Sequence, residues 1–206
     1  MERVFNLIIV DESGSMSIIR QQAFSGMNET LSTVRSLQEK YPEREQRVTL
    51  VTFDSDHVKW HYDNTSAKET RDLAWNAYNP CAATPLYDTI GKAVSKLNAM
   101  VGKDDNVLVT IITDGMENCS EEWTQPMIHN LINKLKEQKW TFTLIGTDNL
   151  DVKGMAHSMN IDECMCFEES PEATMNMFAT ERKARELYND RIANNVEMTR
   201  GSFFDE

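Results

Sequence analysis

Two acids and three hydroxyl residues stand at the ends of apolar stretches, where their oxygens can converge on one ion. The segment DESGS places Asp11, Ser13 and Ser15 at alternate positions directly after the apolar run FNLIIV. Asp114 ends a second apolar run, and Thr84 precedes PLYD, which is typical of a helix start. Carboxylate and hydroxyl oxygens suit Mg²⁺ or Mn²⁺ better than zinc or copper. We therefore expect these five residues to form a site for one divalent cation.

The hydroxyl groups in this set have a chemical consequence. On a sharp turn after a strand, residues i, i+2 and i+4 can face one point, and we expect Gly14 to permit backbone geometry that a Cβ would hinder. Hydroxyl ligands neutralise less of the metal charge than carboxylates do. The ion would therefore remain attractive to a carboxylate from outside the chain.

The elements that must position these residues alternate between strand and helix patterns. Strands are expected at 5–10, 47–55, 57–64, 106–115, 140–148 and 164–169, and helices at 17–41, 65–78, 85–101, 123–139, 152–159 and 171–192. The two strands at 47–55 and 57–64 are expected to form a hairpin. Continuous apolar strands indicate burial on both faces, so we predict a doubly wound α/β fold whose helices cover both sides of a parallel sheet. Ligands of such folds bind outside the carboxyl ends of the strands.

Length and charge limit the possible partners. A chain of 206 residues with 40% hydrophobic residues fits one domain, assigned to 1–192, followed by a tail at 193–206. The net charge of −12 argues against nucleic acid as a partner, because phosphate binding requires clustered Lys and Arg. No apolar run approaches bilayer length and no signal-like leader is present, so we expect a cytoplasmic protein that does not bind membranes.

Four cysteines without a secretion signal are expected to be reduced. Cys164 and Cys166 alternate along a predicted strand, so they should share one face, and we expect them to be small buried apolar groups.

The set Asp11, Ser13, Ser15, Thr84 and Asp114 resembles the metal-ion-dependent adhesion site of the von Willebrand factor A domain, and the pattern of acid, two serines, threonine and acid is complete and in order. The resemblance covers nearly the whole chain and implies a mostly parallel sheet with one antiparallel edge strand. It also implies that the two serines ligate the metal directly, that Thr84 does so in the ligand-competent state, and that the two acids act largely through water. The partner would supply the completing carboxylate. Small intracellular members of the family, associated with tellurite resistance, stress responses or AAA+ ATPases, are the nearest in type.

Each motif taken alone also has a purely structural interpretation. Ser13, Ser15 or Thr84 could cap a helix, and an Asp-Gly pair after a strand is commonly a turn. Asp88 is expected to favour a helix N-terminus through the dipole. Three further polar residues, Glu12, Glu117 and Asn118, are interpreted as solvated loop residues at the rim.

Two classes of function remain open. The first is a non-catalytic, metal-dependent protein-binding module, and the second is a magnesium-dependent phosphotransfer enzyme of similar fold. Haloacid-dehalogenase-like phosphatases carry a second Asp where this chain has Ser13, and neither a phosphate-binding loop nor a nucleophile elbow is found. We therefore expect a binding module and not an enzyme.

The C-terminal segment NNVEMTRGSFFDE suggests a second mode of contact. Asp205 or Glu206, with Phe203 and Phe204 as apolar anchors, could dock on another molecule, including the metal site of a neighbouring copy. Weak self-association through the tail is therefore a hypothesis, with a solvated chain end as the alternative.

Overall fold

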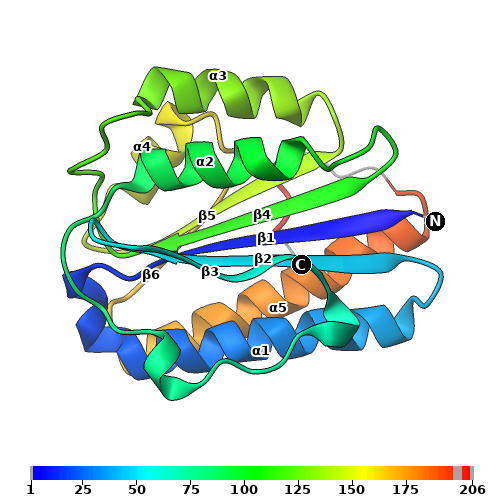
Figure 1. Cartoon of the computed structure of the whole chain (residues 1–206), viewed down its shortest axis with the longest axis horizontal. Helices are drawn as coiled ribbons and strands as arrows, with labels where there is room; N and C mark the ends of the chain where they lie inside the picture. The colour runs from blue at the N-terminus through cyan, green and yellow to red at the C-terminus, as the bar shows by residue number, and fades with distance from the viewer. Residues whose placement is uncertain (1, 197–200, 205–206) are drawn as a thin grey trace.

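A computed structural model describes residues 2–196 and 201–204, and its centre is a six-stranded sheet (Figure 1). The strands are β1 (Arg3–Asp11), β2 (Glu45–Phe53), β3 (Val58–Ser66), β4 (Asn106–Thr113), β5 (Trp140–Thr147) and β6 (Glu163–Phe167). They lie in the order β3-β2-β1-β4-β5-β6, and only the β2–β3 pair is antiparallel. The predicted mostly parallel sheet with one antiparallel edge strand is therefore confirmed.

Helices cover both faces of the sheet, as predicted for a doubly wound fold. They are α1 (Arg20–Lys40), α2 (Leu86–Asn98), α3 (Gln125–Lys136), α4 (Val152–Ser158) and α5 (Pro171–Ala193). Figure 1 shows α2, α3 and α4 on one side and α1 and α5 on the other. A hydrophobic core lies on each face of the sheet, and alternate residues of β1 contribute to each. Leu7 and Ile9 pack in the core on the α2 side, whereas Ile8 and Val10 pack in the core on the α1 side.

The strand register brings the predicted metal residues to one edge of the sheet. β1 and β4 are parallel neighbours, with Val10 opposite Ile112. Both strands therefore end at the same edge, and the chain leaves them at Asp11 and Asp114.

The helix predicted at 65–78 is wrong. β3 continues to Ser66, and the remainder is irregular apart from the 3-10 turns Ala67–Glu69 and Trp75–Ala77. Side chains of other elements hold this segment: the Asn28 carboxamide accepts from the Leu73 N–H at 2.7 Å, and the Tyr62 hydroxyl donates to the Arg71 carbonyl at 2.6 Å. Backbone groups of this segment therefore form hydrogen bonds with side chains outside it, in place of the backbone hydrogen bonds that a helix would have formed.

All four cysteines are free, which agrees with the prediction of reduced thiols. The expected burial of the pair on β6 is wrong, because Cys164 is half-buried and Cys166 is exposed. β6 is an edge strand of five residues that pairs only with β5 in the described sheet, so its side chains have neighbouring strand residues on one side alone. Within the described residues, no helix combines the length and apolarity needed to cross a bilayer.

The described part of the tail packs on its own domain. Phe203 is 2% exposed and lies 6.1 Å, between ring centroids, from Tyr188 of α5. The backbone N–H groups of Gly201 and Phe203 donate to the Glu163 carboxylate at 2.6 and 2.8 Å. The hypothesis that Phe203 anchors another molecule is therefore wrong, because this ring is already buried; Asp205 and Glu206 lie outside the described residues.

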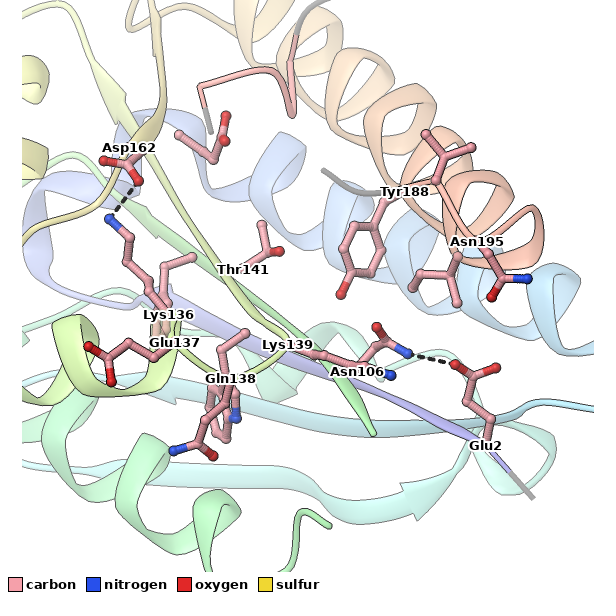
Figure 2. A pocket seen from close by; sticks show the side chains of 15 residues that line it. Glu2, Asn106, Lys136, Glu137, Gln138, Lys139, Thr141, Asp162, Tyr188 and Asn195 are labelled. Atoms are coloured by element: carbon pink, nitrogen blue, oxygen red, sulfur yellow. Dashed lines mark hydrogen bonds and ion pairs between the residues drawn. The ribbon is translucent and has the colours of Figure 1, made fainter. Parts of the chain in front are cut away.

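A pocket of about 480 Å³ opens at the other edge of the sheet, where β4 and β5 begin (Figure 2). Its polar side chains pair with one another: Lys136 contacts Asp162 at 2.5 Å, and Asn106 donates to Glu2 at 3.0 Å. None of the predicted metal residues lines this pocket.

Removal of the Phe203 ring should reduce stability. We expect Phe203→Ala to lower the free energy of unfolding by about 3 kcal/mol, because the variant leaves a cavity against Tyr188. Val196→Ala, at a side chain that is 55% exposed, is the control and should change it by less than about 0.5 kcal/mol. Urea unfolding measures both, and equal effects would show that the tail is not docked.

Candidate metal centre

Hydrogen bonds connect four of the five predicted metal residues. The Ser15 hydroxyl donates to Asp114 Oδ1 at 2.7 Å and lies 3.2 Å from the Ser13 hydroxyl. The backbone N–H of Ser13 donates to Asp11 Oδ1 at 2.7 Å, and the Thr113 hydroxyl donates to Asp11 Oδ2 at 2.6 Å. The ends of β1 and β4 thus meet in one cluster of oxygens.

Thr84 approaches this cluster across Gly115. A Cβ added to Gly115 would lie 3.0 Å from Thr84 Oγ1 and 3.4 Å from Asp11 Oδ2, so both oxygens face the same point on the backbone. Thr84 is held there by Asn118, whose side-chain oxygen accepts from the Thr84 N–H at 2.9 Å. The structure therefore brings all five predicted residues together.

The side chains of the two acids in this cluster are buried by the protein itself. Asp11 and Asp114 are 0% and 3% exposed. Burial raises the pKa of Asp11, although hydrogen bonds from Thr113 and Ser13 oppose the change. Burial also raises the pKa of Asp114 to about 6, with a further contribution from the charge of Asp11. A compensating positive charge between them would relieve this cost.

One oxygen of the cluster shows that the residues fit a cation. Asp114 Oδ2 is buried and has no hydrogen-bond partner among the described residues. Buried carboxylate oxygens are normally satisfied, so an orphan beside two serine hydroxyls is what a hard cation would complete. The capping alternative finds no support: Ser13 precedes a 3-10 turn and makes no side-chain cap, and α2 begins after Pro85 without one.

The expected role of Gly14 is wrong. Its φ is not positive, and a Cβ there would lie 3.6 Å from the Ala82 carbonyl, an ordinary contact. Its backbone matters instead, because the Gly14 N–H donates to that carbonyl at 3.1 Å and so ties the first loop to the Thr84 loop. Gly115 is the glycine where a side chain would meet the cluster.

The prediction that Glu12 is a solvated loop residue is wrong. Glu12 is 0% exposed. Its carboxylate contacts Lys59 Nζ at 2.6 Å, accepts from the Thr52 hydroxyl at 2.6 Å, and accepts from the Asn79 N–H. Its backbone carbonyl accepts from the Cys81 N–H at 2.9 Å. Glu12 therefore joins the first loop to the β2–β3 hairpin and to the segment that leads to Thr84.

Two other acids organise the loop after β4. The Glu117 carboxylate accepts from the backbone N–H groups of Tyr87, Cys119 and Ser120. Asp88 accepts from Glu121, Glu122 and Trp123, and hydrogen bonds from these three amides and the charge of Lys92 lower its pKa against an opposing effect of burial. Glu117 is therefore not a solvated rim residue. Asp88 lies in the first turn of α2, as expected, and both acids fix the loop after β4 to the start of that helix.

A second group of possible ligands lies in the β2–β3 turn. Single atoms of Asp54, Asp56 and His57 lie within 4.8 Å of one another. The four histidines of the chain, at 57, 61, 129 and 157, show no paired spacing that would indicate a metal site. Asp54 Oδ1 already accepts from the N–H groups of Asp56 and His57 at 2.7 and 2.8 Å, which accounts for the group as a turn.

The family assignment rests on the sequence profile of the von Willebrand factor type A domain, which matches residues 7–189. The chain belongs to the von Willebrand factor type A (VWA) domain family. VWA domains commonly mediate protein–protein interactions. No curated protein sequence matches this VWA chain.

Solved structures share the VWA fold at low sequence identity. The VWA domain of SpRpn10 is 14% identical, with coverage of 88% of this chain and 95% of that chain and a TM-score of 0.58. The domain of the type V pilus tip protein Mfa5 from Porphyromonas gingivalis is 11% identical, with coverage of 96% and 97% and a TM-score of 0.61. Proximal thread matrix protein 1 of the mussel byssus is 14% identical, with coverage of 89% and 46% and a TM-score of 0.60, so this chain spans about half of its length.

The raised pKa of Asp114 predicts how the metal-free protein responds to pH. A group with a folded-state pKa above its unfolded value stabilises the fold at low pH and loses that contribution as pH rises through the folded pKa. In EDTA, stability should therefore fall by up to about 3 kcal/mol between about pH 4 and about pH 7. Asp114→Asn should flatten this profile, whereas the exposed control Asp104→Asn should retain it. Urea unfolding across this range measures it, and a wild-type-like slope in Asp114→Asn would contradict the assignment.

The Glu12–Lys59 pair predicts unequal effects of two substitutions. Lys59→Met leaves a buried carboxylate without its cation and should cost about 3 kcal/mol of unfolding free energy. Glu12→Gln leaves a lysine that is 33% exposed and should cost less. The double variant should be more stable than the sum of the single effects implies, which a double-mutant cycle measures. Additive effects would show that the pair is not coupled.

Proposed function

We propose that this VWA domain is a non-catalytic protein-binding module whose metal-ion-dependent adhesion site holds one Mg²⁺ or Mn²⁺. The residues that would hold it are Asp11, Ser13, Ser15, Thr84 and Asp114. The observation that carries the proposal is the buried Asp114 Oδ2, which has no hydrogen-bond partner among the described residues although the Ser15 hydroxyl donates to the other oxygen of the same carboxylate. The donors are oxygens throughout, which suits a hard cation.

The chain's own residues prepare the site for such an ion. Asp11 is fixed by the Ser13 N–H and the Thr113 hydroxyl, and Asp114 is fixed on one oxygen by Ser15. A bound cation would supply an electrophilic centre for a carboxylate of the partner. Because two of the three loops contribute neutral hydroxyls, the chain leaves charge on the ion for that contact.

The alternative, a magnesium-dependent phosphotransfer enzyme, has less support. Haloacid-dehalogenase-like phosphatases need a second Asp where this chain has Ser13, and Lys59, which lies beside the first loop, is already paired with Glu12 at 2.6 Å. Turnover of an aryl phosphate with Mg²⁺, abolished by Asp11→Asn, would favour the enzyme.

We further propose that the module acts in the cytoplasm, as a stand-alone intracellular VWA domain, on a protein partner and not on nucleic acid or membranes. The four free cysteines and the net charge of −12 support this part of the proposal. Self-association through the tail is not proposed, because the Phe203 ring is buried in its own chain.

Metal binding tests the proposal directly. Titration calorimetry should show one Mn²⁺ per chain, and the double variant Ser13→Ala, Ser15→Ala should bind it at least about tenfold more weakly, because two oxygens are removed from the cluster. Ser17→Ala is the control, since the Ser17 hydroxyl donates to the Gly14 carbonyl and not to the cluster. Equal binding by the double variant would refute the proposed site.

A further inference from the structure

A groove of about 340 Å³ lies beside the metal centre on the α2 side of the sheet. Its lining residues are Tyr87, Met116, Glu117, Asp151, Gly154, Met155, Ser158 and Met159. We call it the methionine groove, after the three residues that supply its large apolar side chains. Figure 1 shows that α4 and the start of α2, which supply half of the lining residues, lie at the edge where β1 and β4 end.

The groove offers an apolar surface, and its two acids accept backbone hydrogen bonds. Met116 is 65% exposed, whereas Met155 is half-buried and Met159 is buried. Of the two acids in the lining, Glu117 accepts from three backbone N–H groups and Asp151 accepts from the Gly154 N–H at 2.9 Å. Both acids therefore already accept backbone hydrogen bonds, and methionine side chains can adapt to the shape of an apolar occupant.

The groove is continuous with the metal centre through two shared loops. Met116 follows Asp114 by two residues, and Tyr87 follows Thr84 by three. Two hydrogen bonds join these loops, since Asn118 accepts from the Thr84 N–H and donates its own N–H to the Thr84 carbonyl at 3.2 Å. A partner segment that places a carboxylate at the metal therefore runs beside the groove.

Surface charge adds a requirement on the partner. Asp148, Glu168 and Glu169 follow β5 and β6 at the same edge, and the whole chain carries a net charge of −12. A partner with several acids would be repelled, so basic residues are expected around the single carboxylate.

We infer that the methionine groove receives a large apolar side chain from the same protein segment whose carboxylate engages the metal. The segment recognised is thus one acid with Leu, Ile, Met or Phe within about three residues and with basic neighbours. This inference rests on the proposed function and adds a side-chain subsite to it. The metal attracts the carboxylate, and the groove selects the apolar residue beside it.

Peptide selection tests the inference. A phage-displayed library of random dodecapeptides is selected on the full chain with Mn²⁺ and eluted with EDTA. The expected result is enrichment of peptides that combine one Asp or Glu with a nearby large apolar residue and with Lys or Arg. Enrichment of acidic peptides without the apolar residue, or no enrichment over a selection in EDTA, would overturn the inference.

Matched variants then locate the contact. Met116→Gln and Met155→Gln should each weaken binding of the selected peptide about tenfold, with unchanged Mn²⁺ affinity, because each loses apolar contact. Met175→Gln on α5, at a side chain that is 64% exposed, is the control and should bind normally. Wild-type peptide affinity in both groove variants would refute the groove, whereas absence of Mn²⁺ binding in the wild type would refute the proposed function itself.

Discussion

Two carboxylates, Asp11 and Asp114, are buried near one another where β1 and β4 end. Burial of two negative charges is unfavourable, and residues of the surrounding loops and of β4 donate hydrogen bonds to them. Asp11 and Asp114 extend two strands that are apolar on both faces, so the backbone carries them into the interior and away from solvent. Hydrogen bonds from Ser13, Ser15 and Thr113 satisfy three of their four oxygens. The fourth oxygen, Asp114 Oδ2, has no hydrogen-bond partner among the described residues, and a bound cation could coordinate it.

Two other buried charges are paired with an opposite charge of the protein itself. Glu12 is paired with Lys59, and Arg185, which is 0% exposed between α5 and the sheet, contacts Glu181 at 2.5 Å and donates to Asn6 and Thr110. In both cases a side chain of the protein supplies the opposite charge, so no bound ion is needed to balance it. Asp11 and Asp114 have no such cation among the described contacts, and this difference distinguishes a candidate binding centre from a structural ion pair.

The loops that surround the centre are joined to one another and not only to the sheet. Glu12 connects the first loop to the hairpin, Gly14 bonds to the Thr84 loop, and Asn118 bonds Thr84 to the loop after β4. This cross-linking holds neutral hydroxyls at fixed positions without a bound ion. Tyr87, Met116 and Glu117 of the methionine groove lie on or next to these loops, so one surface can present a charged and an apolar contact together.

The sequence by itself determined the class of fold and the set of oxygens. Continuous apolar strands alternating with helical patterns can be buried only in a parallel sheet covered on both faces, and such a sheet gathers the residues after its strands at one edge. Asp11, Ser13, Ser15, Thr84 and Asp114 could therefore be chosen before any coordinates. Local patterns failed where contacts between distant segments decide the conformation. The segment 65–78 is held by Asn28 and Tyr62 and not by its own backbone, Phe203 is buried by a helix that precedes it, and Glu12 is buried because Lys59, which lies 47 residues away, supplies its counter-charge. A pairing energy between residues far apart in sequence leaves no periodic trace in either segment, so only the tertiary structure could decide these points.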